Sequence, residues 1–127
     1  KLKKNRGMSS IVLFSSVAAQ RGFSMHTSIA MAKGAVNGLT RSLAAELSPL
    51  IRVNAISPSI TQTPLTEKIL SNPSMAEAIK NKHPLNRLGT PKDMAALAAF
   101  LISEDAGWIT GQIIGVDGGR STIEVKG

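Results

Sequence analysis

The sequence of 127 residues contains no cysteine and no tyrosine, and aromatic residues make up only 3% of it. Without cysteine the chain can form neither disulfides nor thiolate metal sites, which suits a reducing compartment, and we expect a cytoplasmic protein. No apolar run approaches the roughly 20 residues of a membrane-spanning helix, so we expect no contact with a membrane. The length fits a single domain over residues 1–127, or half of a larger one.

Charge of one sign is scarce as well. Acidic residues number 8 against 15 lysines and arginines, which gives a formal net charge of +7. Such a balance is compatible with nucleic-acid binding. However, four of the basic residues lie within the first six positions, and aromatic side chains for base stacking are nearly absent. We therefore interpret the charge as a solvated basic surface and do not expect nucleic acid as a partner.

Three short apolar runs predict β-strands. Residues 9–14 form a continuous β-rich run, which is typical of a strand buried on both faces of a parallel sheet. Residues 51–57 and 112–116 are the second and third predicted strands. Ser15 and Ser16 follow the first strand, and ligands of open α/β sheets bind at that carboxyl edge.

Helical patterns separate these strands. A long helix is predicted from His26–Ser28 to Leu47, with an apolar stripe formed by Val36, Leu39, Leu43 and Leu47. We expect a loop over 17–25 and short helices over 65–70 and 73–82, the second capped by Asn72. Thr90, Pro91 and Asp93 form the start signal of a further helix. The order β-α-β-(α-α)-α-β predicts an α/β fold, a partial Rossmann-type doubly wound parallel sheet of about three strands with flanking helices.

Several motifs occur in the order of one known family. Ser16 ends the first strand, and Ile29 and Lys33 follow on the helix, four positions apart. Arg52-Val53-Asn54 lies in the second strand, and Val116-Asp117-Gly118-Gly119 closes the third. The segment from Gly7 to Gly119 resembles the C-terminal half of a short-chain dehydrogenase/reductase. That family has a Tyr-x-x-x-Lys motif on this helix, 13 positions after the serine, and Ile29 occupies the tyrosine position here.

The resemblance implies a site for NAD or NADP and a small-molecule carbonyl or alcohol substrate. It assigns Ser16 and Lys33 to catalysis, and it assigns Lys33 also to the ribose hydroxyls of the cofactor. Pro58 and Ser59 stand where the family has Pro-Gly, and Thr61 and Thr63 lie where its members contact the nicotinamide carboxamide and the diphosphate. The glycine-rich phosphate loop of the family does not occur in this sequence, so we expect weak dinucleotide binding by this chain alone.

The isoleucine at position 29 conflicts with the chemistry that the resemblance implies. Hydride transfer to a carbonyl leaves negative charge on its oxygen, and a general acid that neutralises it contributes roughly 10²–10⁴-fold to the rate. Ile29 carries no proton to give. His26 is a candidate substitute, although a loop or capping role is the simpler interpretation. His83 has no predicted partner.

Two functions remain open from the sequence. The first is an NAD(P)-dependent short-chain oxidoreductase that is inactive or severely impaired in this form. The second is a non-enzymatic module of the same origin that assembles into a dimer, because a three-stranded sheet leaves edges open for pairing.

Overall fold

The computed structural model describes residues 7–125, so the basic cluster within residues 1–6 lies outside the described part of the chain. The elements follow the predicted order. They are β1 (Ser9–Phe14), η2 (Val17–Ala19), α1 (Thr27–Leu47), β2 (Ile51–Pro58), α2 (Glu67–Leu70), α3 (Pro73–Lys80), α4 (Pro91–Ile102), η3 (Glu104–Ala106) and β3 (Ile113–Val116). The predicted α/β class, with three parallel strands and flanking helices, is confirmed.

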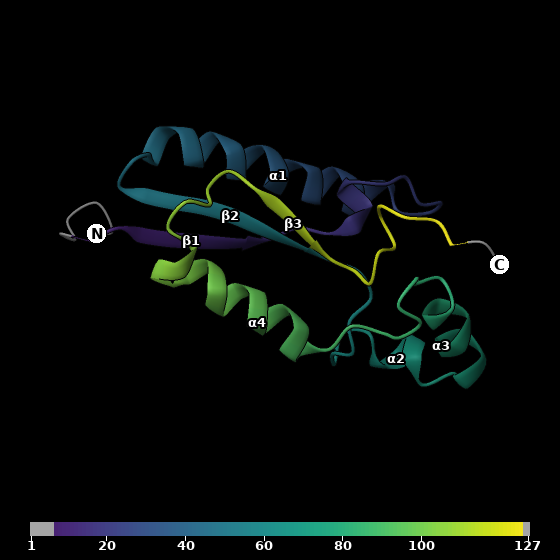
Figure 1. The fold of residues 1–127 in the computed structure, drawn as a ribbon. Coiled ribbons are helices and arrows are strands. Elements are labelled where there is room, and N and C mark those ends of the chain that lie inside the picture. Colours follow the sequence, from purple (N-terminus) through teal and green to yellow (C-terminus); the bar gives the residue numbers. More distant parts are fainter. Residues whose placement is uncertain (1–6, 126–127) are drawn as a thin grey trace.

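The sheet has β2 at its centre, between β1 and β3. Ser9 of β1 pairs with Ile51 of β2, and Ala55 of β2 pairs with Ile113 of β3. Because all strands are parallel, their carboxyl ends meet at one edge of the sheet. In Figure 1 this edge lies on the right, where the loop after β1, the two short helices and the C-terminal segment gather.

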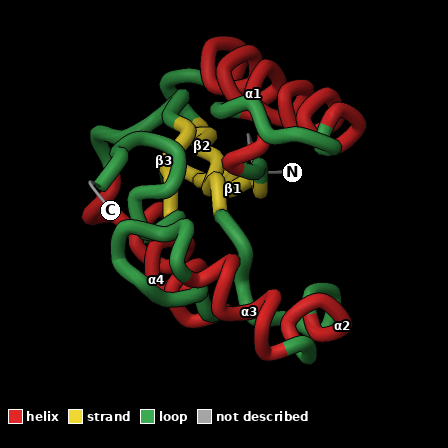
Figure 2. Tube along the Cα trace, turned by 90° about the vertical axis from the view of Figure 1, so that its right-hand side faces the viewer, coloured by secondary structure: helices red, strands yellow, loops and turns green. Residues whose placement is uncertain are grey.

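Helices cover both faces of the sheet. The long helix α1 packs on one face and α4 on the other, so the sheet is the middle of three layers (Figures 1 and 2). Each face has its own apolar core. The core on the α4 side contains Ile56, Met94, Leu101 and Ala106, and the core on the α1 side contains Ala44, Ile51 and Val53. Burying one such Leu, Ile or Val side chain contributes about 1.5–3 kcal/mol.

The central strand also buries polar side chains that tie it to the segment before β3. The Arg52 guanidinium donates hydrogen bonds to the carbonyls of Ile109, at 3.3 Å, and Ser103, at 3.0 Å. Asn54, which is fully buried, donates to the Ile109 carbonyl at 2.9 Å and accepts from the Gln112 amide at 3.0 Å. Buried polar groups stay inside a protein when they are paired in this way. These bonds fix the path of the chain into β3.

The predicted apolar stripe of the long helix is wrong at Leu39, which is 48% exposed. The face that contacts the sheet is centred on the buried Thr40 and Ala44. Successive helical residues are rotated by about 100°, so Leu39 lies roughly 100° from Thr40 and turns outward. The same rotation brings Lys33 to the inner face, where its side chain is half-buried.

Local signals at the helix ends are largely confirmed. The Asn72 side chain accepts from the Met75 amide, and Thr90 and Asp93 form the expected capping box at the start of α4. The two predicted short helices are shorter than expected. The first, α2, spans only residues 67–70, and the second, α3, starts at Pro73 as predicted but ends at Lys80 instead of Lys82. The loop predicted over 17–25 contains the turn η2, because Ser16 caps it. Within residues 7–125, none of the helices has the length and apolar character needed to cross a membrane.

Candidate functional site

A cavity of about 270 Å³ opens at the carboxyl ends of β1 and β2. It is lined by every residue that the sequence marks as a catalytic or cofactor-binding candidate, from three separate stretches of the chain. These residues are Ser16, Ile29, Lys33, Pro58, Ser59, Thr61 and Thr63. We call it the serine–lysine cavity. The structure therefore brings the whole predicted set together around one space.

Ser16 lies where β1 ends and the chain turns into η2. Its hydroxyl oxygen accepts a hydrogen bond from the Ala18 amide at 3.2 Å and so caps that short turn. Within residues 7–125 the Ser16 side chain makes this hydrogen bond as an acceptor, through a lone pair of its oxygen. The hydroxyl proton therefore remains available for a ligand. The neighbouring Ser15 is buried and donates to the Lys33 carbonyl at 3.4 Å, which makes it a structural link between β1 and α1.

Lys33 reaches back from α1 to the end of β1. Its ammonium donates to the Phe14 carbonyl at 3.1 Å. An ammonium has three protons, so two remain for other acceptors in the cavity. The Phe14 bond fixes the direction of the side chain, and the amine and the Ser16 hydroxyl contribute to the same cavity wall.

Ile29 stands one helical turn before Lys33 and is 38% exposed at the cavity wall. It adds an apolar group where a proton donor would be needed. His26 also lines the cavity, but its ring Nδ1 donates to the Ser24 carbonyl at 2.7 Å and its ring lies 5.8 Å from that of Phe23. A neutral ring bonded in this way has no proton left on Nε2. Its side chain makes no cap bond to α1.

The loop after β2 is organised by Thr66, which the sequence analysis did not single out. Its hydroxyl donates to the Thr61 carbonyl at 2.6 Å and accepts from the Thr63 amide at 3.1 Å. The Thr61 hydroxyl donates to the Ser59 carbonyl at 3.0 Å. The loop is thus held in shape by its own threonines, with Thr63 and Thr66 facing the cavity.

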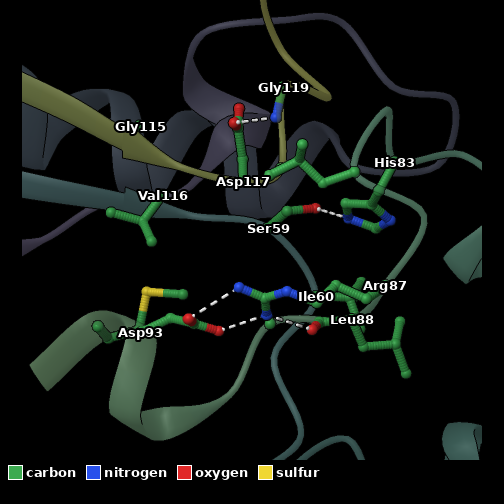
Figure 3. A pocket seen from close by; sticks show the side chains of 14 residues that line it. Ser59, Ile60, His83, Arg87, Leu88, Asp93, Gly115, Val116, Asp117 and Gly119 are labelled. Atoms are coloured by element: carbon green, nitrogen blue, oxygen red, sulfur yellow. Dashed lines mark hydrogen bonds and ion pairs between the residues drawn. The ribbon is translucent and has the colours of Figure 1, made fainter. Parts of the chain in front are cut away.

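Sequence reasoning also missed the partner of His83, which is only 3% exposed. Its Nδ1 lies 2.8 Å from the Ile79 carbonyl. Its Nε2 lies 2.8 Å from the Ser59 hydroxyl, and Figure 3 shows this bond. A carbonyl can only accept, so Nδ1 carries the proton, and the Nε2 of the neutral ring accepts from Ser59. A hydroxyl at position 59, where the resembled family has glycine, was the signal that a partner is needed.

Ser59 lies in the wall between the serine–lysine cavity and a second cavity of about 290 Å³. We call the second the histidine cavity (Figure 3). An ion pair crosses it, because the Arg87 guanidinium binds both carboxylate oxygens of Asp93, at 2.7 and 2.9 Å. The hydrogen bonds from Arg87 and from Thr90 lower the pKa of the Asp93 carboxyl well below its usual range.

Asp117 is the other carboxylate of the histidine cavity. Burial by itself would raise its pKa, but hydrogen bonds from the Ser121 side chain and from the Gly119 amide lower it below its usual value. Figure 3 shows the bond to Gly119. Gly119 has φ +87, so the turn after β3 requires the freedom of glycine there. Among residues 7–125, no group of acidic or histidine side chains has the arrangement of a metal site.

Comparison with known proteins identifies relatives over most of the chain. The family model described as enoyl-(acyl carrier protein) reductase matches residues 1–121. The short-chain reductase protein NovJ of Streptomyces niveus is 41% identical over 124 residues, which cover 92% of this chain and 47% of that protein. The short-chain dehydrogenase/reductase SDRA of Arabidopsis thaliana is 45% identical over 114 residues, which cover 87% of this chain and 44% of that protein.

Solved structures of two dehydrogenases superpose on most of this chain. The ligand-free aldohexose dehydrogenase of Thermoplasma acidophilum superposes with a TM-score of 0.86 at 34% identity, covering 95% of this chain and 52% of that one. A 4-hydroxyisoleucine dehydrogenase complexed with NADH gives a TM-score of 0.85 at 34% identity, covering 91% and 48% of the two chains. The chain thus spans about half the length of the proteins that it matches.

Proposed function

Because the chain belongs to the short-chain dehydrogenase/reductase family, we propose that it forms the catalytic wall of an NAD(P)-dependent oxidoreductase that interconverts a carbonyl and an alcohol. It corresponds in this proposal to the C-terminal half of such an enzyme, working in the cytoplasm. The observation that carries the proposal is the convergence of Ser16, Lys33 and the loop from Pro58 to Thr63 on one cavity. With isoleucine at position 29, catalysis at this site is absent or severely impaired.

The residues of the serine–lysine cavity suit the nicotinamide end of the cofactor. The cavity, at about 270 Å³, has room for a ring and its amide but not for a whole dinucleotide. Thr61 and the backbone at Pro58 and Ser59 would hold the carboxamide side, and Thr63 would contact the diphosphate. The two remaining protons of Lys33 would bind ribose hydroxyls. When bound, NAD(P) supplies or accepts the hydride. The glycine-rich turn that binds the pyrophosphate has no counterpart in the sequence, so tight binding requires residues from a further segment.

Ser16 and Lys33 act on the substrate oxygen and its surroundings. The free hydroxyl proton of Ser16 donates to the carbonyl oxygen of the substrate and polarises it. The Lys33 ammonium adds positive charge next to the developing alkoxide. Ile29, at the position of the family's tyrosine, has no proton to give, so the cavity lacks the general acid of the family. In its neutral form the His26 ring holds its proton on Nδ1, which is bonded to the Ser24 carbonyl. The missing general acid costs roughly 10²–10⁴-fold in rate.

A rescue experiment tests this proposal. The N-terminal half of the Streptomyces niveus relative is joined to this chain, and oxidation of NADH and NADPH is followed with a panel of ketones. We expect Ile29→Tyr to raise turnover of the hybrid by at least about 10²-fold, because the phenol supplies the proton. Ile29→Phe is the matched control, because it has the ring without the hydroxyl. Equal turnover by the tyrosine and phenylalanine variants, or fast turnover with isoleucine, would contradict the proposal.

Self-assembly is the second candidate function. The outward face of α1 carries apolar side chains, with Met31 74% and Leu39 48% exposed. A second copy of this chain would bury them and form a dimer. Sedimentation velocity tests this candidate: a dimer that Leu39→Lys converts to a monomer supports it, and a monomeric wild type at micromolar concentration contradicts it.

A further inference from the structure

Two arginines from distant parts of the chain meet beside the serine–lysine cavity. Arg21 follows η2, and Arg120 follows the turn after β3. The Arg21 guanidinium donates to the backbone carbonyl of Arg120 at 2.7 Å. Both guanidiniums lie against the ring of Phe23, at 4.8 Å from its centroid for Arg120 and 6.0 Å for Arg21. The fold thus holds two positive charges around one aromatic ring.

Within residues 7–125, neither guanidinium forms an ion pair with an acid. The ion pairs within 4.0 Å that the structure records over residues 7–125 are Lys80–Glu77 and Arg87–Asp93. Arg120 is half-buried, and burial together with the nearby charge of Arg21 lowers its pKa. Both causes oppose the charged form. An anion bound between the two arginines would remove this cost.

The arginines line a hollow of about 320 Å³ that adjoins the serine–lysine cavity. Phe23 and Arg120 contribute to the walls of both spaces. Lys82 adds a third cation to the hollow, and Pro84, Ile123 and Val125 add apolar surface. Glu124 also lines the hollow, without an ion pair to any of the cations. The hollow therefore combines positive charge with a surface that an alkyl chain can cover.

We propose that this arginine hollow binds the carboxylate of the substrate, and that the substrate is an oxo acid or the corresponding hydroxy acid. A planar carboxylate matches the two-pronged donor geometry of a guanidinium. The apolar residues favour an organic acid over inorganic phosphate. The assignment of the carbonyl end to Ser16 rests on the proposed function, whereas anion binding by the hollow does not.

Titration of the 127-residue chain with levulinate, followed by amide NMR shifts at low ionic strength, tests the inference without cofactor or turnover. Levulinate carries a ketone and a carboxylate, and methyl levulinate is its neutral analogue. We expect saturable binding of levulinate, roughly tenfold weaker binding of the ester, and a loss of roughly tenfold in Arg120→Gln and in Arg21→Gln. Lys92→Gln, which removes an exposed positive charge from α4, leaves binding unchanged.

Several results would overturn the inference. They are no saturable binding of levulinate, equal binding of its methyl ester, or unchanged affinity in both arginine variants with preserved amide spectra. Inorganic phosphate that competes with levulinate and binds more tightly would overturn the organic-acid assignment. Glu124→Gln removes the competing carboxylate, and tighter binding in that variant supports the site. Because the rescue of turnover by Ile29→Tyr is measured separately, failure here leaves the proposed function standing.

Discussion

The serine–lysine cavity and the histidine cavity share Ser59 but differ in the pairing of the residues after which they are named. In the histidine cavity, Arg87 is paired with Asp93 and His83 with Ser59 and Ile79. In the serine–lysine cavity, the Ser16 hydroxyl proton and two protons of Lys33 have no partner among the described residues. Two cavities of similar volume, about 270 and 290 Å³, therefore differ in how these groups are paired.

The difference shows that volume alone does not identify a functional site. The pairing of the buried His83 contributes to the stability of the fold, because each buried donor or acceptor left alone would cost about 1–3 kcal/mol. Free donors at a cavity wall can instead bind a ligand without first breaking an internal bond. This contrast favours the serine–lysine cavity as the reaction site and the histidine cavity as its support. Substitutions at matched residues of the two cavities test that division.

The largest difference is expected between Lys33 and Arg87, one cation from each cavity. In the Ile29→Tyr hybrid, Lys33→Met removes the ammonium but keeps much of the apolar stem, and we expect turnover to fall on the order of 10²-fold. Arg87→Met makes the same kind of change in the histidine cavity and leaves turnover unchanged. The measurement is cofactor oxidation at saturating substrate. A similar loss in both variants would show that the two cavities do not differ in function.

The two histidines provide a stability comparison. His83→Leu keeps much of the side-chain volume but removes both hydrogen bonds and leaves Ser59 and the Ile79 carbonyl without partners, so we expect a loss of about 2 kcal/mol. His26→Leu changes an exposed side chain and should cost less than about 0.5 kcal/mol. Urea unfolding measures both. If His26→Leu lowers the free energy of unfolding as much as His83→Leu does, the hydrogen bonds of His83 are not what stabilises the fold at the histidine cavity.

The smallest effect concerns acid stability. The folded-state pKa of Asp93 lies below its unfolded value of about 3.9, so its contribution is present above that pH and is lost as the pH falls below it. We expect Asp93→Asn to flatten the fall of stability below about pH 4. Asp105→Asn removes an exposed carboxylate on η3 and is the charge-matched control. Unfolding curves across this pH range measure the effect, and identical slopes for wild type and Asp93→Asn would refute it.

Much of the fold was predictable because its signals are local. The capping box at Thr90 needs only four consecutive residues, and the strand over 9–14 needs only its own apolar run. The carboxyl-edge rule for parallel strands then places Ser16 and the loop after Pro58 on the same side of the sheet. The shared cavity of Ser16 and the loop after Pro58 follows from this rule, whereas the position of Lys33 depends on which face α1 turns to the sheet.

The remainder depends on contacts between distant segments. Ser59 and His83 are 24 positions apart, and Arg21 and Arg120 are 99 apart. No pattern in the sequence links either pair, since both meet only after the loops have taken their final path. The exposure of Leu39 has another origin. Apolar residues spaced by three or four positions predict a helix with one apolar face, but they do not fix which residue lies at the centre of that face. In the structure, the face of α1 that packs on the sheet is the one that carries the buried Thr40 and Ala44.

Ser59 links the threonine loop to His83. Its carbonyl accepts from the Thr61 hydroxyl and its own hydroxyl is bonded to His83, just after α3. A ligand in the serine–lysine cavity that displaces Ser59 would therefore alter its bond to the His83 ring, which lines the other cavity. The NMR signals of the His83 ring would then report whether the serine–lysine cavity is occupied, without an added label.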